Sequence, residues 1–130
     1  MSLNDPLSNV LSHINNCEKI GREECIVKPV SKTILKVLDI MKDEKYIKSY
    51  EKIDNNKGGL IKIKLMSKIN KCNVIKPRLS FQSSNLEKFE KRYLPAKDFG
   101  VIIVSTNQGL MTHIQAKEKN LGGRLISYIY

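Results

Sequence analysis

The chain has 130 residues, a formal net charge of +10 at pH 7 and 41% hydrophobic residues, enough apolar side chain for one compact domain or two small ones. No apolar run approaches the roughly 18 residues that a membrane span requires, and the polar start, residues 1–9, lacks the features of a signal peptide. We therefore expect a cytoplasmic protein with a polyanionic partner, foremost a nucleic acid, because each Lys or Arg that neutralises a phosphate releases condensed counterions.

The first part of the chain predicts helix, strand and helix in that order. Asp5 followed by Pro6 is typical of a helix start, and apolar residues at helical spacing carry this helix to about Cys17. A short β-branched strand is expected at 24–28, and Ser31 then begins a second helix with one apolar face.

A β-hairpin is predicted next, from two strand-like segments at 46–53 and 60–66 that flank a polar turn at 54–59. The second strand alternates between two faces, with Ile61, Ile63 and Leu65 on one and Lys62 and Lys64 on the other. This alternation predicts one core face and one cationic face.

A boundary is predicted near Asn70, so that the chain is an α+β protein with an N-terminal α-β-α-β-β module, residues 1–70, packed on a smaller C-terminal module, residues 71–130. The C-terminal module is expected to be β-rich with short helices. Its strands are expected at 74–78, 99–104 and 125–130, and its helices at 86–93 and 112–119.

Every charged residue between Asn55 and Leu86 is basic. The segment contains Lys57, Lys62, Lys64, Lys68, Lys71, Lys76 and Arg78. Such a surface attracts phosphates without reading base sequence. An ordinary solvated lysine-rich face is the alternative, but the net charge of the whole chain favours nucleic acid, and we expect Lys62, Lys64 and Lys71 to contact RNA.

A polar run, Ser105-Thr106-Asn107-Gln108-Gly109, follows the most apolar strand, where a buried strand would emerge into a turn. Short hydroxyl and amide side chains can donate to and accept from base edges, 2′-hydroxyls and phosphates, and glycine permits a close backbone approach. Turns in general prefer these residue types, so the run alone also fits an ordinary turn.

Catalytic and metal sites are not indicated by the sequence. His13 and His113 lack the nucleophile and acid that a triad requires, which argues against hydrolysis. Cys17, Cys25 and Cys72 form no C-x-x-C pair, so we expect reduced thiols in packing roles and neither a disulfide framework nor a zinc site. We therefore expect a protein that is not an enzyme and has no cofactor or small-molecule substrate.

Several ordered sequence blocks resemble the universal small-subunit ribosomal protein family S8, in its archaeal and eukaryotic cytosolic form. The resemblance covers essentially the whole chain. The blocks are Asn4-Asp5-Pro6-Leu7, Ile14-Asn15-Asn16, Pro29 with Ser31-Lys32, Asn70-Lys71-Cys72, Val74-Ile75-Lys76-Pro77-Arg78, Tyr93-Leu94-Pro95-Ala96, Asp98-Phe99-Gly100, Val104-Ser105-Thr106, Gln108-Gly109, Met111-Thr112-His113, Gly122-Gly123-Arg124-Leu125 and Tyr128-Ile129-Tyr130.

The resemblance implies a structural and assembly component that binds the central domain of small-subunit rRNA beside neighbouring ribosomal proteins. In this family the serine-threonine turn makes the most specific RNA contacts, which here implies Ser105, Thr106 and Asn107. By the same match, further contacts with phosphate or sugar are expected from Asn15, Ser31, Lys32 and the backbone at Gly122 and Gly123.

Three residues depart from the family pattern. Lys45 stands where relatives usually carry Gly, Asn73 replaces a usual Gly, and Asn107 stands where Ser or Thr is frequent. Because Asn tolerates a left-handed backbone, Asn73 is expected to preserve a turn.

Two other functions stay open at this point. A free-standing RNA-binding regulator, such as a repressor of its own messenger RNA, would use the same surface as a ribosomal protein. A small RNA-modifying enzyme is the second rival, and the missing catalytic pairing argues against it.

Overall fold

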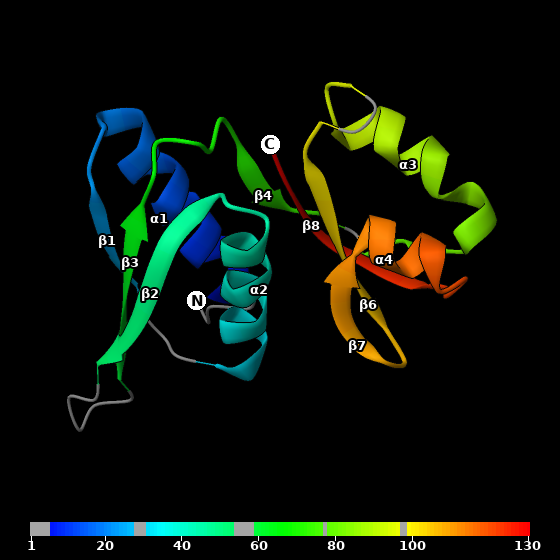
Figure 1. The fold of residues 1–130 in the computed structure, drawn as a ribbon, viewed down its shortest axis with the longest axis horizontal. Coiled ribbons are helices and arrows are strands. Elements are labelled where there is room, and N and C mark those ends of the chain that lie inside the picture. The colour runs from blue at the N-terminus through cyan, green and yellow to red at the C-terminus, as the bar shows by residue number, and fades with distance from the viewer. Residues whose placement is uncertain (1–5, 28–30, 54–58, 77, 97–98) are drawn as a thin grey trace. The chain divides into compact units, whose positions relative to one another are not determined.

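The computed structural model describes residues 6–27, 31–53, 59–76, 78–96 and 99–130. The chain forms two compact units, the N-terminal unit Met1–Asn70 and the C-terminal unit Lys71–Tyr130 (Figure 1). Within the described residues there are four α-helices and two antiparallel sheets, which confirms the predicted α+β class.

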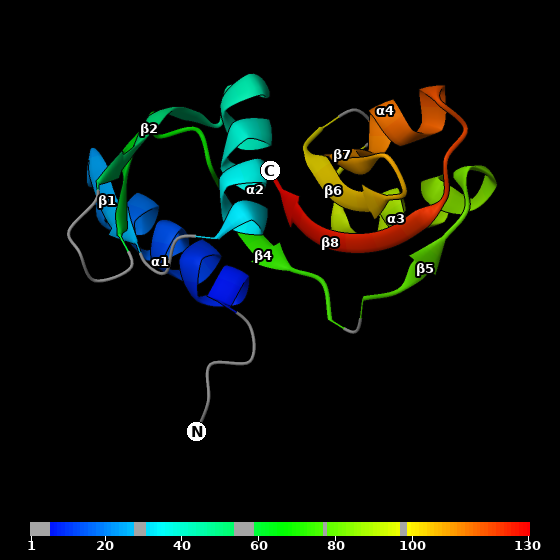
Figure 2. The same cartoon turned by 90° about the horizontal axis from the view of Figure 1, so that it is seen from below.

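The N-terminal unit has the predicted α-β-α-β-β order. Its elements are α1 (Pro6–Ile20), β1 (Glu24–Val27), α2 (Lys32–Asp43), β2 (Ile47–Ile53) and β3 (Leu60–Leu65). The three strands pair in the order β1-β3-β2, and α1 and α2 pack on one face of this sheet (Figures 1 and 2). The expected helix start at Asp5 and the hairpin turn at 54–58 lie outside the described residues.

The core of the N-terminal unit follows from the apolar periodicity of its elements. The helices bury Leu7, Val10, Leu11, Ile14 and Cys17 from α1, and Ile34, Val37, Leu38 and Met41 from α2. In β3, Ile61, Ile63 and Leu65 are buried while Lys62 and Lys64 alternate with them, as predicted. The helix α1 continues to Ile20, about one turn beyond the predicted end.

Lys45, between α2 and β2, has a left-handed backbone with φ of 65°. An L side chain in this conformation costs roughly 1–2 kcal/mol, and glycine avoids most of that cost. This backbone conformation identifies Lys45 as a strained residue.

Replacing Lys45 with Gly is therefore expected to raise the free energy of unfolding by up to about 1 kcal/mol, after the greater flexibility of the unfolded glycine chain offsets part of the gain. Lys42→Gly is the matched control, because it also removes one exposed lysine but lies inside α2. It should lower stability by about 1 kcal/mol. Urea denaturation of both variants measures the difference, and a destabilised Lys45→Gly variant would contradict the assignment of strain.

The C-terminal unit is a five-stranded sheet with helices. Its elements are β4 (Cys72–Val74), β5 (Ser80–Phe81), the 3-10 turn η1 (Ser83–Asn85), α3 (Leu86–Tyr93), β6 (Val101–Thr106), β7 (Gly109–Thr112), α4 (His113–Glu118) and β8 (Gly123–Ile129). The strands pair in the order β4-β8-β6-β7, and β5 also pairs with β8. The central strand is therefore β8 (Figure 2).

Three expectations for this unit are wrong in detail. The strand predicted at 74–78 is replaced by β4, which ends at Val74, and by β5, which begins at Ser80. Asn73 lies in β4 opposite Tyr128, so it is not a left-handed turn residue. The polar run 105–109 is not a turn throughout, because Ser105 and Thr106 end β6 and Gly109 begins the unpredicted strand β7.

The predicted helices α3 and α4 are confirmed. His113, the first residue of α4, contacts both α3 and the sheet. The His113 ring is buried, and its Nδ1 accepts a hydrogen bond from the backbone N–H of Ile102 at 3.0 Å. Its Nε2 lies 3.4 Å from a carboxylate oxygen of Glu90 on α3, and the same oxygen lies 3.3 Å from Nζ of Lys117. These contacts give His113 a structural role at the junction of β6, α3 and α4.

Candidate nucleic-acid interface

The end of the β6–β7 hairpin is a tight turn that Thr106 holds in place. Thr106 pairs with Gly109, which leaves Asn107 and Gln108 as a two-residue connection. The Thr106 Oγ1 accepts a hydrogen bond from the backbone N–H of Gln108 at 3.1 Å and donates to the carbonyl oxygen of Gly109 at 3.0 Å. Thr106 therefore positions the turn, and Asn107 and Gln108 are exposed at its tip.

Ser105 belongs to a polar row that crosses three strands. It lies opposite Arg124 of β8, and Arg124 lies opposite Ser80 of β5. Residues directly opposite one another in antiparallel strands share a face of the sheet. The polar row Ser80, Arg124 and Ser105 therefore runs toward the hairpin end and places one cation among hydroxyl groups.

Arg124 is exposed and was missed as a site residue by sequence reasoning. Arg124 directly follows Gly122 and Gly123, which the sequence analysis predicted to contact RNA. A basic residue beside that pair was the signal that could have identified Arg124 as a further RNA contact. What the sequence did not show is the strand register that places Arg124 opposite Ser105.

Gly122 and Gly123 have packing reasons for being glycine. A Cβ added to Gly123 would overlap the carbonyl oxygen of Ser105 and lie 2.9 Å from its carbonyl carbon. A Cβ added to Gly122 would lie 2.9 Å from the carbonyl oxygen of Phe81. Both glycines let the start of β8 approach neighbouring backbone closely, and Gly123 sets the spacing between β8 and β6.

The hairpin end offers hydrogen-bonding groups that no other described residue occupies. Within the described ranges, the Ser105 hydroxyl and the side-chain amides of Asn107 and Gln108 have no hydrogen-bond partner. Hydroxyl and amide groups both donate and accept hydrogen bonds, and Arg124 adds donors suited to phosphate. On a rigid sheet, this combination can recognise the irregular shape of a folded RNA.

The site residues expected in the N-terminal unit lie on two opposite sides of its sheet. Asn15 is half-buried on α1, and Ser31 caps α2, where its Oγ accepts the N–H of Ile34 at 3.2 Å. Lys32 is the exposed first residue of α2. The helices cover one face of the sheet, whereas Lys62 and Lys64 project from the other, so the structure does not bring the two groups together.

Lys62 and Lys64 lie on the outer face of the N-terminal sheet. The sequence predicted a cationic face here, but in the structure this face also carries acidic residues. Glu24 of β1 lies opposite Lys64, and Glu51 of β2 lies opposite Lys62. The Lys62 Nζ lies 3.4 Å from a carboxylate oxygen of Glu24. The prediction was wrong because alternation along one strand does not show which acidic residues the neighbouring strands supply.

The remaining basic residues of the segment are exposed where the structure describes them. These are Lys68, Lys71, Lys76 and Arg78, whereas Lys57 lies outside the described residues. Lys71 exchanges two backbone hydrogen bonds of 2.9 Å with Tyr130, at the opposite end of β8 from Arg124. Lys71 therefore shares the C-terminal unit with the hairpin end but not its location.

The helices in the described part of the chain include none that is long and apolar enough to cross a membrane. A basic α+β chain with a polar hairpin end fits RNA binding. Residues 5–130 match a family model, and this match settles the class of the protein. The protein is a ribosomal protein that binds rRNA. Its family is one of structural ribosomal proteins and not a family of enzymes.

That family model is described as Ribosomal protein S8, and the chain belongs to this family. The chain is thus a component of the small ribosomal subunit and takes part in translation. The resemblance to the S8 family, drawn from the ordered sequence blocks, is confirmed.

Proposed function

We propose that the protein binds the central domain of small-subunit rRNA and supports assembly of the subunit, with the β6–β7 hairpin end as its site of discrimination. The observation that carries this proposal is the alignment of Ser105 with Arg124 beside the exposed tip at Asn107 and Gln108. A sheet holds these groups in fixed positions, so little entropy is lost when they bind.

Charged side chains and neutral polar side chains contribute differently to the proposed RNA binding. Arg124 and the exposed lysines supply attraction to phosphates, which is general and depends on salt. Ser105, Asn107 and Gln108 supply hydrogen bonds that require a particular RNA shape. We propose further contacts with RNA phosphates, sugars or nearby bases. The residues that make them are Thr106, Gly109, Gly122, Gly123, Asn15, Ser31, Lys32 and Lys71.

Ultraviolet crosslinking of the purified chain to small-subunit rRNA, followed by identification of crosslinked peptide and nucleotide, tests the proposal. We expect crosslinks between the peptide that contains residues 105–109 and nucleotides of the central domain. Crosslinks confined to another rRNA domain would contradict the proposal. Sedimentation with the small subunit at high salt separates a ribosomal component, which stays bound, from a free-standing regulator, which does not.

Lys64 and Lys62 allow a test of the salt-dependent attraction between lysines and RNA phosphates. Replacing Lys64 with Gln should flatten the dependence of log affinity on log salt by roughly 0.7–0.9, the change for one phosphate. Lys62→Gln is the matched control, because Lys62 is already paired with Glu24 and neutralises a phosphate only if that pair breaks. Its slope should change less. Equal slopes for wild type and Lys64→Gln, measured by filter binding, would show that Lys64 does not meet phosphate.

A further inference from the structure

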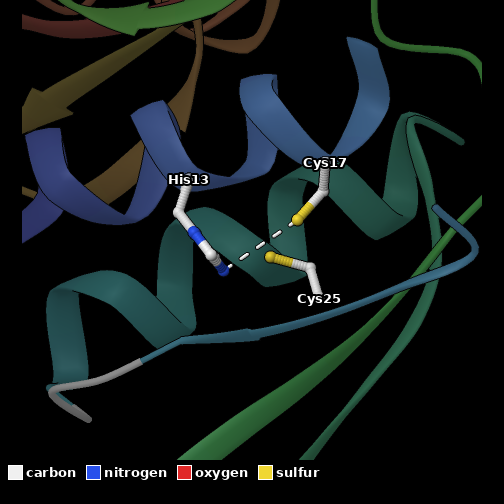
Figure 3. Close-up of side chains that lie close together, drawn as sticks. All are labelled: His13, Cys17 and Cys25. Carbon is white, nitrogen blue, oxygen red and sulfur yellow. Dashed lines mark hydrogen bonds between the residues drawn. The ribbon is translucent and has the colours of Figure 1, made fainter. Parts of the chain in front are cut away.

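Three side chains with metal-binding atoms converge in the N-terminal unit. His13 and Cys17 are four residues apart on α1, so they share one face of the helix, and Cys25 comes from β1, which packs on α1. One ligand atom of each lies within 4.8 Å of those of the other two. Figure 3 shows the His13 ring and both sulfur atoms directed toward one another.

These distances are close to those of a metal centre. The Nε2 of His13 lies 3.9 Å from the Sγ of Cys17. Around tetrahedral zinc, with bonds of about 2.3 Å to sulfur and 2.0–2.1 Å to nitrogen, neighbouring ligand atoms lie roughly 3.5–3.8 Å apart. Small side-chain rotations would therefore bring the three atoms into a first coordination shell.

The burial of the ligands fits a bound divalent ion. Cys17 and Cys25 are buried and their thiols are not in disulfides. Two thiolates and one neutral imidazole balance the charge of a divalent cation, so the occupied site carries no net charge and avoids the cost of burying an isolated ion. His13 is exposed and lines a small hollow with Asn9, Val10, Ile26 and Val27, so this ligand is accessible to solvent.

We propose that His13, Cys17 and Cys25 form a binding site for one Zn²⁺ ion, which fastens β1 to α1. Nitrogen and sulfur are the ligands that zinc prefers, and water would occupy the fourth position. On binding, both thiols lose their protons to solvent and their sulfur atoms bond to the metal, while the imidazole binds in its neutral form. No electron is transferred.

Zinc affinity of the full chain, kept reduced and free of oxygen, tests the site by competition with a chromophoric chelator. We expect one ion per chain and, with Co²⁺ in place of Zn²⁺, the charge-transfer absorption of cobalt bound to thiolate. His13→Gln should weaken binding by more than about 100-fold, since even changes behind the ligands cost about 10–100-fold. Because His13 is exposed, this variant should fold normally.

Cys72→Ser is the matched control, because Cys72 is also a buried cysteine outside any disulfide but lies in the C-terminal unit, outside the cluster. Its zinc affinity should equal that of the wild type. A second readout is thermal unfolding, where zinc should raise the midpoint for the wild type and Cys72→Ser but not for His13→Gln. An absence of stoichiometric binding, or equal affinity for wild type and His13→Gln, would overturn the proposal.

Discussion

Replacing Gly123 with Ala is expected to lower the free energy of unfolding by about 3 kcal/mol or more, because the added methyl group meets backbone that cannot move aside. The atoms in its way are the carbonyl oxygen and carbon of Ser105 and the Cα of Thr106. Relief requires the first residues of β8 to separate from the end of β6. Urea denaturation, with the midpoint and slope fitted together, measures the loss.

Gly21→Ala is the control for the cost of an added methyl group on a glycine. Gly21 has a positive φ of 84° but nothing within 4 Å of the added Cβ, so only backbone strain should appear, at about 1 kcal/mol. If Gly123→Ala were no less stable than Gly21→Ala, the close approach of β8 to β6 would not be a constraint on this protein.

The double replacement Ser105→Ala with Asn107→Ala is expected to weaken binding of central-domain rRNA by about 1–3 kcal/mol per lost group, or roughly tenfold or more in total. Each truncation leaves an RNA group without its hydrogen-bond partner. Neither removes a charge, so the salt dependence of binding and the affinity for unrelated RNA should barely change. Filter binding of both RNAs across a salt series measures all three quantities.

Arg124→Gln provides the contrasting variant on the same polar row. It removes one cation, so it should weaken binding to both RNAs and flatten the salt dependence by up to roughly 0.9. Thermal unfolding must first show that the Ser105 and Asn107 double variant is folded. If that folded variant kept the wild-type ratio of affinities for central-domain and unrelated RNA, discrimination would lie elsewhere on the protein.

The helices and the hairpin of the N-terminal unit could be predicted because their signals are local. In α2, the apolar residues Ile34, Leu38 and Met41 recur at helical spacing, and all three are buried. Strand β7 was missed because its four residues are too few to show a period. The segment 74–78 was misassigned because β4 and β5 are defined by pairing with β8, which is distant in sequence.

The residues of the candidate sites also differ in whether a local sequence signal could identify them. Polarity at the exit of an apolar strand, together with the family resemblance, selected Ser105, whereas Arg124 depends on strand register. His13 and Cys17 carried a local signal in their spacing of four residues. Their cluster stayed hidden because Cys25 reaches it from another element, and no spacing along the chain specifies that packing.

The position of β8 in both sequence and sheet has a consequence for biosynthesis. This strand follows every other strand of its sheet along the chain, yet it pairs with β4, β5 and β6. During translation those partners leave the ribosome with their pairing edges open, and they must wait until residues 123–129 have emerged. Among the described residues, all three strands of the N-terminal sheet end by Leu65. Vectorial synthesis therefore forms the N-terminal sheet first, and the polar row is assembled only when β8 closes its sheet.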